Sequence, residues 1–533
     1  MRDSRNIIIL TIVCIFIFFY GLGNMALTDP DETFYAETAK EMLKANEWIT
    51  PLIFGKPQFE KPILYYWLVE LSFKFFGVNE FAARFPSALF GIIGCLAIYF
   101  IGRILFSSLS GLIASLFTAT CTQYIIITRA CVTDVVLTAF ITLCFLFFLL
   151  GLEKENKLFY IISAVMAALA VLTKGPIGVF IPAVIIGLYM IFTRQWEAFK
   201  KIPFILSILV FLAISLPWYI IVFKLHGSAF TSEFFGLHNI IRFLEPEHRI
   251  GSSPFFYIPA ILGGFLPWTP FLIFGTWYMV KSEVGESAIK APRLFLALWF
   301  FFIFLFFSAS STKLVTYVFP LFPVLSIVIG RFWERFLEND QDIHLRRLMN
   351  YSYVLFALVC VLAFVGGYFV IQTVYPQVLK GALIASVFFI AFAGISIVLY
   401  VRKKFLVSFY ILILSGAISI VPIVAFVLPV IEEFETSKAI SYKLKELAGK
   451  DEAIGGECDH RRGIAFYSDR VNVADIHSYN DLISFLSSEK RVWGVIQKKH
   501  YQQIKENKPE LVSEPLFEAG DYIIISNESA EVR

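Results

Sequence analysis

The feature that most constrains this chain is its succession of about thirteen apolar segments, which are candidates to cross a bilayer as helices of about 20 residues. The fifth of them is short and could instead pack against a neighbouring segment. The segments centre on Val13, Cys95, Ala119, Leu143, Val165, Val184, Val210, Phe265, Phe301, Val324, Leu362, Ala391 and Ile418. Composition agrees, because 58% of the residues are hydrophobic and only 16% are charged, whereas soluble chains average about a quarter charged. The sequence therefore predicts a polytopic α-helical membrane protein.

The distribution of basic residues predicts the orientation of the chain. When the N-terminus is placed in the cytoplasm, the cytoplasmic loops are rich in Lys and Arg, including Arg103, Arg194, Arg346 and Lys403. The short outer loops contain far fewer basic residues, as the positive-inside rule requires. An odd number of spans then places the C-terminus outside the cytoplasm.

Three polar stretches on the predicted outer face set the domain organisation. Two are long loops, at residues 25–84 and 224–254, within a transmembrane domain of residues 1–431. The third is the tail, residues 432–533, in which "EAIGG", "GIAFYS", "VNVAD", "RVWGVIQ" and "DYIIIS" are typical of strands. "SKAISYKLKELAGK" and "YNDLISFLSSEK" are typical of helices. We therefore expect a small α/β domain of about a hundred residues.

The first outer loop begins with the acidic stretch "TDPDETFYAETAKEM", residues 28–42. Tyr35, Ala39 and Met42 recur at helical spacing, which predicts an amphipathic helix at the membrane surface with its charged side chains on other faces. For Asp29 we favour the role of an N-cap. Asp31 stands at the helix start too, where a carboxylate favours the helix N-terminus, and both a capping and a catalytic role are open to it.

Acidic and basic side chains from distant motifs gather on the predicted outer face. They are Asp31, Glu60, Lys61, Arg129, Asp134, Lys174, His238, Arg242, Arg249, Lys313 and Tyr317. The outer cations are not explained by orientation, because Lys and Arg are disfavoured there. Lys61, beside an aromatic run, is also typical of an interfacial anchor. Together the acids and cations indicate an outward-facing site for a phosphorylated lipid, with a carboxylate as general base.

Six motifs carry a resemblance to a known family. In chain order they are "DPDETFYAETAKEM", "FEKPILYYWL", "NEFAARFPSALFG", "RACVTDVVLTAF", "LTKGPIG" and "KLVTYVFPLFP". The sequence resembles the bacterial aminoarabinose transferases that modify lipid A, and the wider group of protein O-mannosyltransferase-like glycosyltransferases. The resemblance spans about residues 27–323, and the tail resembles the family only in its layout.

The resemblance implies a GT-C fold and an enzyme of the bacterial inner membrane. It implies inverting transfer of a pentosyl or hexosyl group from a polyprenyl-phosphate donor, typically undecaprenyl phosphate, to lipid A or another acceptor on the periplasmic side. The C-terminal domain would then be periplasmic. We expect a monomer that contacts the lipid bilayer and no nucleic acid.

The resemblance also implies roles for individual residues. Asp31 would be the catalytic carboxylate, and Asp134 a second acid near the centre. The donor phosphate would be bound by Lys61, Arg129, Lys174, Arg242 and Lys313, and the substrate by Tyr35, Glu60 and Tyr317. A histidine of the second long loop is implied as well, for which His238 and His248 both qualify. Gln58 departs from the family pattern, in which an aromatic residue often precedes "FEKP".

Other interpretations and the need for a cofactor stay open. An oligosaccharyltransferase or a protein O-mannosyltransferase, which glycosylate a polypeptide, would share the donor half of the site. A transporter or flippase for lipid-linked sugars would place polar residues at mid-membrane and often show internal repeats, so the one-sided charges favour an enzyme. No cofactor is required, although a divalent metal near Glu60 and the loop histidines is an open alternative.

Overall fold

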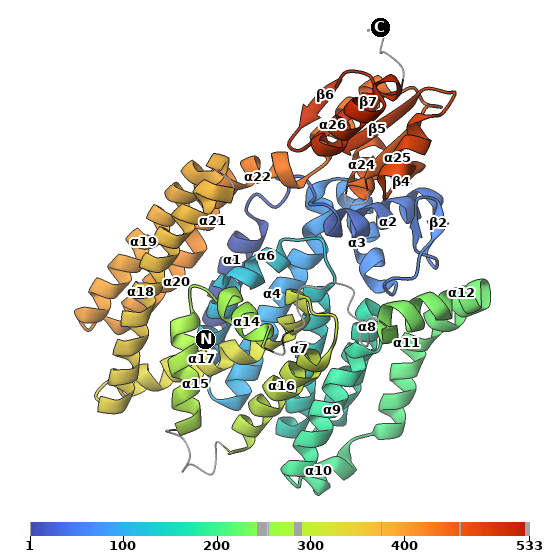
Figure 1. Ribbon diagram of the computed structural model, residues 1–533. Coiled ribbons are helices and arrows are strands. Elements are labelled where there is room, and N and C mark those ends of the chain that lie inside the picture. The colour runs from blue at the N-terminus through green and yellow to red at the C-terminus, as the bar shows by residue number, and fades with distance from the viewer. Residues whose placement is uncertain are drawn as a thin grey trace. The chain divides into compact units, whose positions relative to one another are not determined.

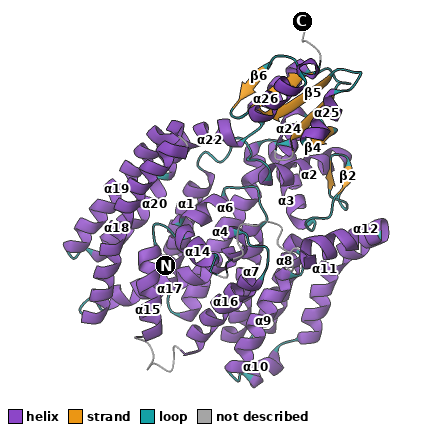
Figure 2. Ribbon diagram, viewed as in Figure 1, coloured by secondary structure: helices purple, strands orange, loops and turns teal. Residues whose placement is uncertain are grey.

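The computed structural model describes residues 2–241, 253, 255–281, 290–374, 376–457 and 460–527. Helices dominate these residues, and the strands among them form a small sheet near the C-terminus and a short hairpin in the first long loop (Figures 1 and 2). The chain begins with α1 (Arg2–Phe19), which is followed by α2 (Asp31–Ala45), the hairpin β1 (Leu52–Ile53) and β2 (Lys56–Pro57), and α3 (Leu64–Phe76).

Nine helical segments of the described chain are long and apolar enough to cross a membrane. They are built from α4 (Glu80–Leu105), α7 (Asp134–Lys154), α8 (Lys157–Lys174), α11 (Phe204–His226), α16 (Lys290–Ala309), η3 (Val315–Leu321) with α17 (Phe322–Glu338), α18 (Ile343–Val374), η4 (Pro376–Val378) with α19 (Leu379–Val401), and α20 (Phe405–Ile418) with α21 (Ile420–Pro422), η5 (Ile423–Val427) and α22 (Leu428–Glu435).

Two further helix pairs meet the same criterion together but are sharply bent. They are α5 (Ser108–Thr120) with α6 (Thr122–Thr128), bent by 68°, and α14 (Tyr257–Gly264) with α15 (Thr269–Lys281), bent by 113°. The remaining helices of this region are α9 (Ile177–Phe192), α10 (Trp196–Lys201), α12 (Ser228–Thr231) and the π-helix η1 (Ser232–Ile241).

The predicted apolar segments agree with these helices, but the predicted number of spans is not confirmed. Every predicted centre lies inside a helix except Phe265, which lies at the bend between α14 and α15. By length and composition the described residues contain nine spans, or eleven if each bent pair counts as one. The other two predicted segments are α9, which has only 16 residues, and α1, which carries Arg2, Asp3 and Arg5 in its first turns.

The chain divides into two compact units, which we describe separately. The membrane unit comprises Met1–Tyr20, Phe59–Tyr65 and Pro86–Ile423. The loop–domain unit comprises Gly21–Gln58, Tyr66–Phe85 and Val424–Arg533. The first long loop is therefore shared, because the segment with Glu60 and Lys61 belongs to the membrane unit and the rest of the loop packs with the C-terminal tail.

Glycines allow three helices of the membrane unit to approach closely. A Cβ added at Gly102 of α4 would lie 2.6 Å from the Cα of Gly111 in α5. A Cβ at Gly330 of α17 would lie 2.4 Å from the carbonyl oxygen of Ser110. Small residues at helix contacts are how helices pack tightly in a bilayer. The approach fixes α17, and with it η3, which carries Tyr317.

The predicted C-terminal α/β domain is present. Its strands are β3 (Ala453–Glu457), β4 (Val473–Ile476), β5 (Val492–Gln497), β6 (Phe517–Ala519) and β7 (Tyr522–Ser526), in the order β4-β3-β5-β7-β6. The first three are parallel, and β6 and β7 are antiparallel to their neighbours. The helices are α23 (Lys438–Leu447), α24 (Arg461–Ser468), α25 (Tyr479–Leu486), α26 (Lys498–Asn507) and η6 (Pro509–Leu511). Separate apolar clusters pack on the two faces of the sheet.

The prediction of a strand at "GIAFYS" is wrong, because these residues lie in α24. The reason is topological. Strands β3 and β4 are parallel neighbours, and consecutive parallel strands need a crossover, usually a helix. Residues 463–468 are all buried. A short apolar run of this kind is ambiguous between a strand and a buried helix.

The predicted helix at Asp31 is present as α2, but its predicted exposed polar face is wrong. Glu37, Lys40 and Glu41 are all at most 5% exposed. The Glu41 carboxylate accepts hydrogen bonds from the backbone N–H groups of Phe54 and Gly55, at 2.7 and 2.9 Å, and so holds the β1–β2 hairpin. The charged side chains bind protein rather than water or lipid headgroups.

Glu37 makes the stability of this packing depend on pH. Burial raises the pKa of Glu37 to about 7 from its usual 4.5, against the opposing effect of the Lys40 ammonium 3.1 Å away. The folded protein therefore holds the proton more tightly than the unfolded chain does. The resulting stability is complete below about pH 4.5 and is lost as the pH rises through about 7.

We expect Glu37→Gln to remove this pH dependence. The wild-type thermal midpoint should fall between pH 5 and pH 8, by an amount that corresponds to at most about 3 kcal/mol, and the variant should lack most of that fall. Thermal unfolding in detergent at several pH values measures both. Glu446→Gln, at an exposed glutamate of α23, is the control. If the thermal midpoint of Glu37→Gln fell with pH as steeply as that of wild type, Glu37 would not be the group responsible.

Candidate functional site

The membrane unit brings together Asp134 and Lys174, two residues predicted for the site. Asp134 is the first residue of α7 and Lys174 the last residue of α8. Because the two helices form an antiparallel hairpin, the start of one lies beside the end of the other. Lys174 Nζ donates to Asp134 Oδ1 at 2.7 Å, and the two side chains are only 17% and 11% exposed. This is a nearly buried ion pair at the predicted outer end of the bundle.

Tyr317 completes this group. The Lys174 ammonium lies 5.6 Å from the centroid of the Tyr317 ring, within the range of a cation–π interaction. Gly175, which ends α8 with φ at +85°, forms the tight turn after Lys174. The ammonium is thus held between a carboxylate and an aromatic face.

Lys313 is a buried cation just before η3. It is 7% exposed, and its ammonium donates to the carbonyl oxygen of Ser310 at 2.6 Å. Among the described residues no carboxylate pairs with it. Burying an ammonium without a counter-charge is costly unless an anion binds there. Lys313 is therefore suited to bind an anion such as a phosphate.

The segment that carries Glu60 and Lys61 is anchored on the second long loop. Lys61 Nζ lies 3.2 Å from Glu60 Oε1, and its side chain is 13% exposed. The backbone N–H of Phe59 donates to Glu233 Oε1 of η1 at 3.0 Å, and the Phe59 ring packs on His226 at 5.0 Å between centroids. Sequence analysis missed Glu233 and His226. Their signal in the sequence was weak, because His226 lies at the end of the apolar helix α11 and Glu233 at the start of η1, outside any recognised motif.

Arg129 has structural partners in addition to any role in the site. Its Nη1 donates to the carbonyl oxygens of Ile17 and Phe18, at 2.9 and 3.3 Å. A cation at the C-terminal carbonyls of a helix is favourable, so Arg129 caps the end of α1. Asp134 pairs with Lys174 and not with Arg129, the nearest cation in sequence.

The second long loop is described only in part. His238 lies in η1, but its side chain is outside the described part of the structure. Arg242, His248 and Arg249 lie outside the described residues altogether. Their predicted roles stay predictions. Within the described residues no group of three or more His, Cys, Asp or Glu side chains could hold a metal ion.

Asp31 and Tyr35 belong to the loop–domain unit. Asp31 is the first residue of α2 and is exposed, whereas residues 32–40 of that helix are all buried. Tyr35 is 8% exposed and packs on the ring of Tyr66 at 6.0 Å between centroids. The Gln58 amide donates to the Tyr66 hydroxyl at 2.9 Å. That Asp31 acts with the acids and cations of the membrane unit stays a prediction from the sequence.

Neither Asp31 nor Asp29 is the N-cap of α2. The cap position is occupied by Pro30, whose residue type offers no side-chain acceptor. The first turn is instead fixed by Glu32, which forms an ion pair with Arg84 at 2.7 Å. Arg84 also donates to the backbone carbonyls of Leu22, Met25 and Ala26. Asp31 is therefore an exposed residue at a helix start that is held in place by its neighbours.

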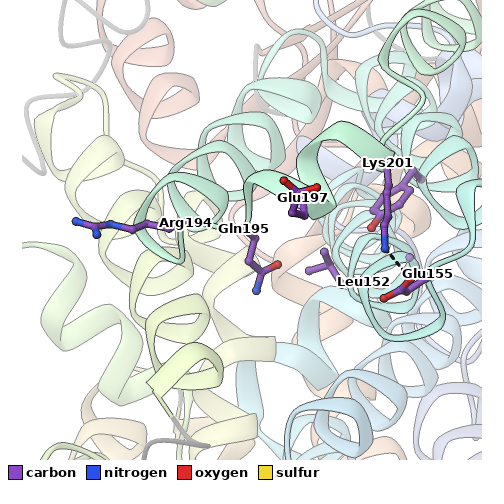
Figure 3. A pocket seen from close by; sticks show the side chains of 8 residues that line it. Leu152, Glu155, Arg194, Gln195, Glu197 and Lys201 are labelled. Carbon is purple, nitrogen blue, oxygen red and sulfur yellow. Dashed lines mark hydrogen bonds and ion pairs between the residues drawn. The ribbon is translucent and has the colours of Figure 1, made fainter.

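A cavity of about 290 Å³ lies in another part of the membrane unit, at the junctions of α7 with α8 and of α9 with α10. Figure 3 shows Lys201 directed at Glu155, with which it pairs at 2.7 Å. Arg194 and Glu197 also line the cavity. None of the predicted site residues lines it, and its basic and acidic residues are equal in number, so we do not place the site there.

Comparisons with known proteins identify similar enzymes. The sequence profile of the dolichyl-phosphate-mannose-protein mannosyltransferase family matches residues 60–221. An undecaprenyl phosphate-α-4-amino-4-deoxy-L-arabinose arabinosyl transferase of Proteus mirabilis is 31% identical over 61% of this chain and 59% of its own length. The enzyme of that name from Aeromonas hydrophila is 30% identical over 73% of this chain and 71% of its own length.

A solved structure is similar over nearly the whole chain. It is ArnT from Cupriavidus metallidurans bound to undecaprenyl phosphate, with a TM-score of 0.84, 20% sequence identity, and 98% of both chains covered. At this level of identity the likeness establishes the fold. The predicted GT-C fold, with many membrane helices and a small C-terminal α/β domain, is confirmed.

Proposed function

Since this chain belongs to the family of undecaprenyl phosphate-α-4-amino-4-deoxy-L-arabinose arabinosyl transferases, we propose that it transfers a sugar from an undecaprenyl-phosphate-linked donor to lipid A. The bond between the anomeric carbon and the phosphate oxygen breaks, and undecaprenyl phosphate leaves with the electron pair. An acceptor oxygen attacks the opposite face of the anomeric carbon, which inverts its configuration. No other co-reactant is needed.

The buried cations of the membrane unit carry this proposal. Lys313 has no carboxylate partner among the described residues, and Lys61 is only 13% exposed beside Glu60. Phosphate is a leaving group whose developing charge is stabilised by preorganised cations in a site that excludes water. We assign Lys313 and Lys61 to the donor phosphate, and the ion pair of Asp134 and Lys174, with Tyr317, to the orientation of the substrate.

Asp31 supplies the catalytic carboxylate in this proposal. Its exposure at the start of α2 leaves it accessible to an acceptor. If the acceptor is a hydroxyl, Asp31 removes its proton as a general base. If the acceptor is a phosphate of lipid A, the oxygen is already ionised and Asp31 orients it.

The proposal includes the orientation of the protein in the membrane. The N-terminus is cytoplasmic, and the C-terminal domain and the acceptor are periplasmic, because the basic loops follow the positive-inside rule in that orientation. We propose that the protein acts as a monomer in the inner membrane.

Two assays test the function. Mass spectrometry of lipid A from cells with and without the protein should reveal an added pentosyl or hexosyl group only when the protein is present. Purified protein with an undecaprenyl-phosphate-linked sugar and lipid A should release undecaprenyl phosphate. Unchanged lipid A in both assays would contradict the proposal.

A second candidate acceptor is a polypeptide. It is favoured by the profile match at residues 60–221, whose family is described as transferring mannose to protein. The donor half of the site would be the same. Mass spectrometry of total glycoproteins from the same two cell lines separates the candidates, because only this alternative predicts a lost protein-linked sugar.

Lys313→Met is expected to weaken donor binding while leaving the protein at least as stable. The substitution removes a buried charge without a counter-charge, so the thermal midpoint without donor should stay the same or rise. The KM for the donor should rise about 10- to 100-fold, since a hydrogen bond to a charged group contributes about 1.5–3 kcal/mol.

Steady-state kinetics against donor concentration, together with thermal unfolding, measure both effects. The matched control is Lys380→Met, at an exposed lysine of α19, which should change neither quantity. A lower thermal midpoint with an unchanged KM would mean that Lys313 is only structural.

A further inference from the structure

The loop–domain unit joins the start of α2 to the C-terminal domain through Asp29, two residues before Asp31. The Asp29 side chain is 2% exposed. Its Oδ2 accepts hydrogen bonds from the backbone N–H and the hydroxyl of Ser437, at 3.0 and 2.7 Å, and lies 3.1 Å from Nδ1 of His460. Its Oδ1 accepts from the hydroxyl of Thr33, in the first turn of α2, at 2.7 Å.

The backbone around Asp29 is held as well. Its N–H donates to the carbonyl oxygen of Glu435 at 3.2 Å. The Arg462 guanidinium lies 4.7 Å from the centroid of the Phe34 ring and 3.5 Å from the carbonyl oxygen of Pro30. Residues on both sides of Asp31 are therefore bound by the C-terminal domain.

Gly463 is required for this approach. A Cβ at Gly463 would lie 2.4 and 2.6 Å from the two Asp29 carboxylate oxygens and 2.0 Å from the Ser437 hydroxyl. These are closer than real Cβ atoms come to other atoms. Any side chain at this position would displace the Asp29 carboxylate and the Ser437 hydroxyl and so disrupt their contact.

A second contact fixes the direction of α2 against α24. The Lys40 ammonium donates to the carbonyl oxygens of Ala465 and Phe466, at 3.1 and 2.7 Å, and pairs with Asp469 at 3.2 Å. Lys44 pairs with Asp469 as well. Lysine at the C-terminal carbonyls of a helix is favourable, so Lys40 caps α24.

The two contacts together align the helices. Asp29 lies at the start of α24 and Lys40 binds carbonyl groups at its end, so α2 and α24 lie side by side and run in the same direction. Neither helix can slide or rotate against the other without breaking a buried polar contact, which leaves donors or acceptors unsatisfied at a cost of about 1–3 kcal/mol each. The C-terminal domain therefore determines where the first turn of α2 lies.

We propose that Asp29, Ser437 and Gly463 are positioning residues that let the C-terminal domain set the place of the Asp31 carboxylate. The inference rests on the proposed function, in which Asp31 is the catalytic group. It gives the C-terminal domain a part in transfer that does not require any of its residues to touch the substrate. Displacement of a catalytic group by about 1 Å can cost about a hundredfold in rate.

Gly463→Ala in the full-length protein tests the proposal. We expect kcat for transfer from an undecaprenyl-phosphate-linked sugar to lipid A to fall about a hundredfold, with the KM for the donor within about twofold of wild type. Gly494→Ala is the matched control, because its Cβ would meet only the Ile525 and Ile496 side chains, at 3.3 Å and beyond. Ser437→Ala, which adds no atoms, should give a smaller loss of kcat in the same direction.

Hydrogen exchange over residues 28–36, measured by mass spectrometry, keeps this test independent of the enzyme assay. Gly463→Ala should accelerate exchange there, and Gly494→Ala should not. Unchanged exchange would overturn the positioning role, and so would a wild-type kcat in Gly463→Ala or a loss seen only in KM. If wild-type protein transfers no sugar, or Asp31→Asn retains full activity, the proposed function fails, while the exchange result still decides whether the C-terminal domain holds α2.

Discussion

Asp31→Asn is expected to lower kcat for sugar transfer by about a thousandfold, which lies within the range for losing a general acid or base. The substitution keeps the size of the side chain and removes its charge. Because Asp31 is exposed and is not the cap of α2, and because asparagine keeps the shape of the side chain, the helix should be retained and the thermal midpoint should change little. Low activity with an unaltered midpoint is the signature of a catalytic group.

The measurement is the initial rate with saturating donor and acceptor, after equal insertion of wild type and variant has been verified. Asp451→Asn, at an exposed aspartate of the C-terminal domain, is the control for loss of one negative charge. Asp31→Glu adds a test of distance, since it restores the charge but moves it by one methylene. Wild-type turnover in Asp31→Asn would exclude Asp31 as the catalytic group.

The membrane architecture could be predicted because a bilayer imposes a strong rule on the sequence. A spanning segment must be apolar over its whole length, and each predicted centre was found in a helix or, for Phe265, at the bend between two helices. The number of spans was harder to predict. A bend such as the one between α14 and α15 depends on local backbone geometry that an apolar window does not encode.

The ion pair of Asp134 and Lys174 was not identified from the sequence, although a signal existed. Opposite charges stood at the start of one apolar segment and the end of the next. Consecutive spans joined by a short loop form a hairpin, which brings those positions together. Arg129, which is closer to Asp134 in the sequence than Lys174 is, binds the end of α1 instead.

The buried charges of α2 could not have been predicted in the same way. The helix was predicted, with its charged side chains on the faces away from the apolar stripe, because nothing in the local sequence indicates a partner more than 400 residues away. Lys40 meets Ala465 across a separation of 425 residues. Such a contact depends on the tertiary packing of α24, a segment that was itself mistaken for a strand.

The ion pair of Asp134 and Lys174 gives the second large effect, because it is expected to serve both folding and transfer. Removing one partner leaves a nearly buried charge without its counter-charge, which costs about 3–5 kcal/mol. Asp134→Asn and Lys174→Met should therefore each lower the thermal midpoint strongly and lose transfer. The double variant removes both charges, so its midpoint should return toward that of wild type.

The transfer activity of the double variant distinguishes a role of the ion pair in folding from a role in binding the substrate. If the pair orients the substrate, as we propose, the double variant should stay inactive although its stability is restored. If the pair is only structural, transfer activity should return together with stability. The exposed pair of Lys201 and Glu155, also 2.7 Å apart but 49% and 69% exposed, is the matched control. Glu155→Gln should leave both the thermal midpoint and transfer close to those of wild type, because water already screens that exposed pair.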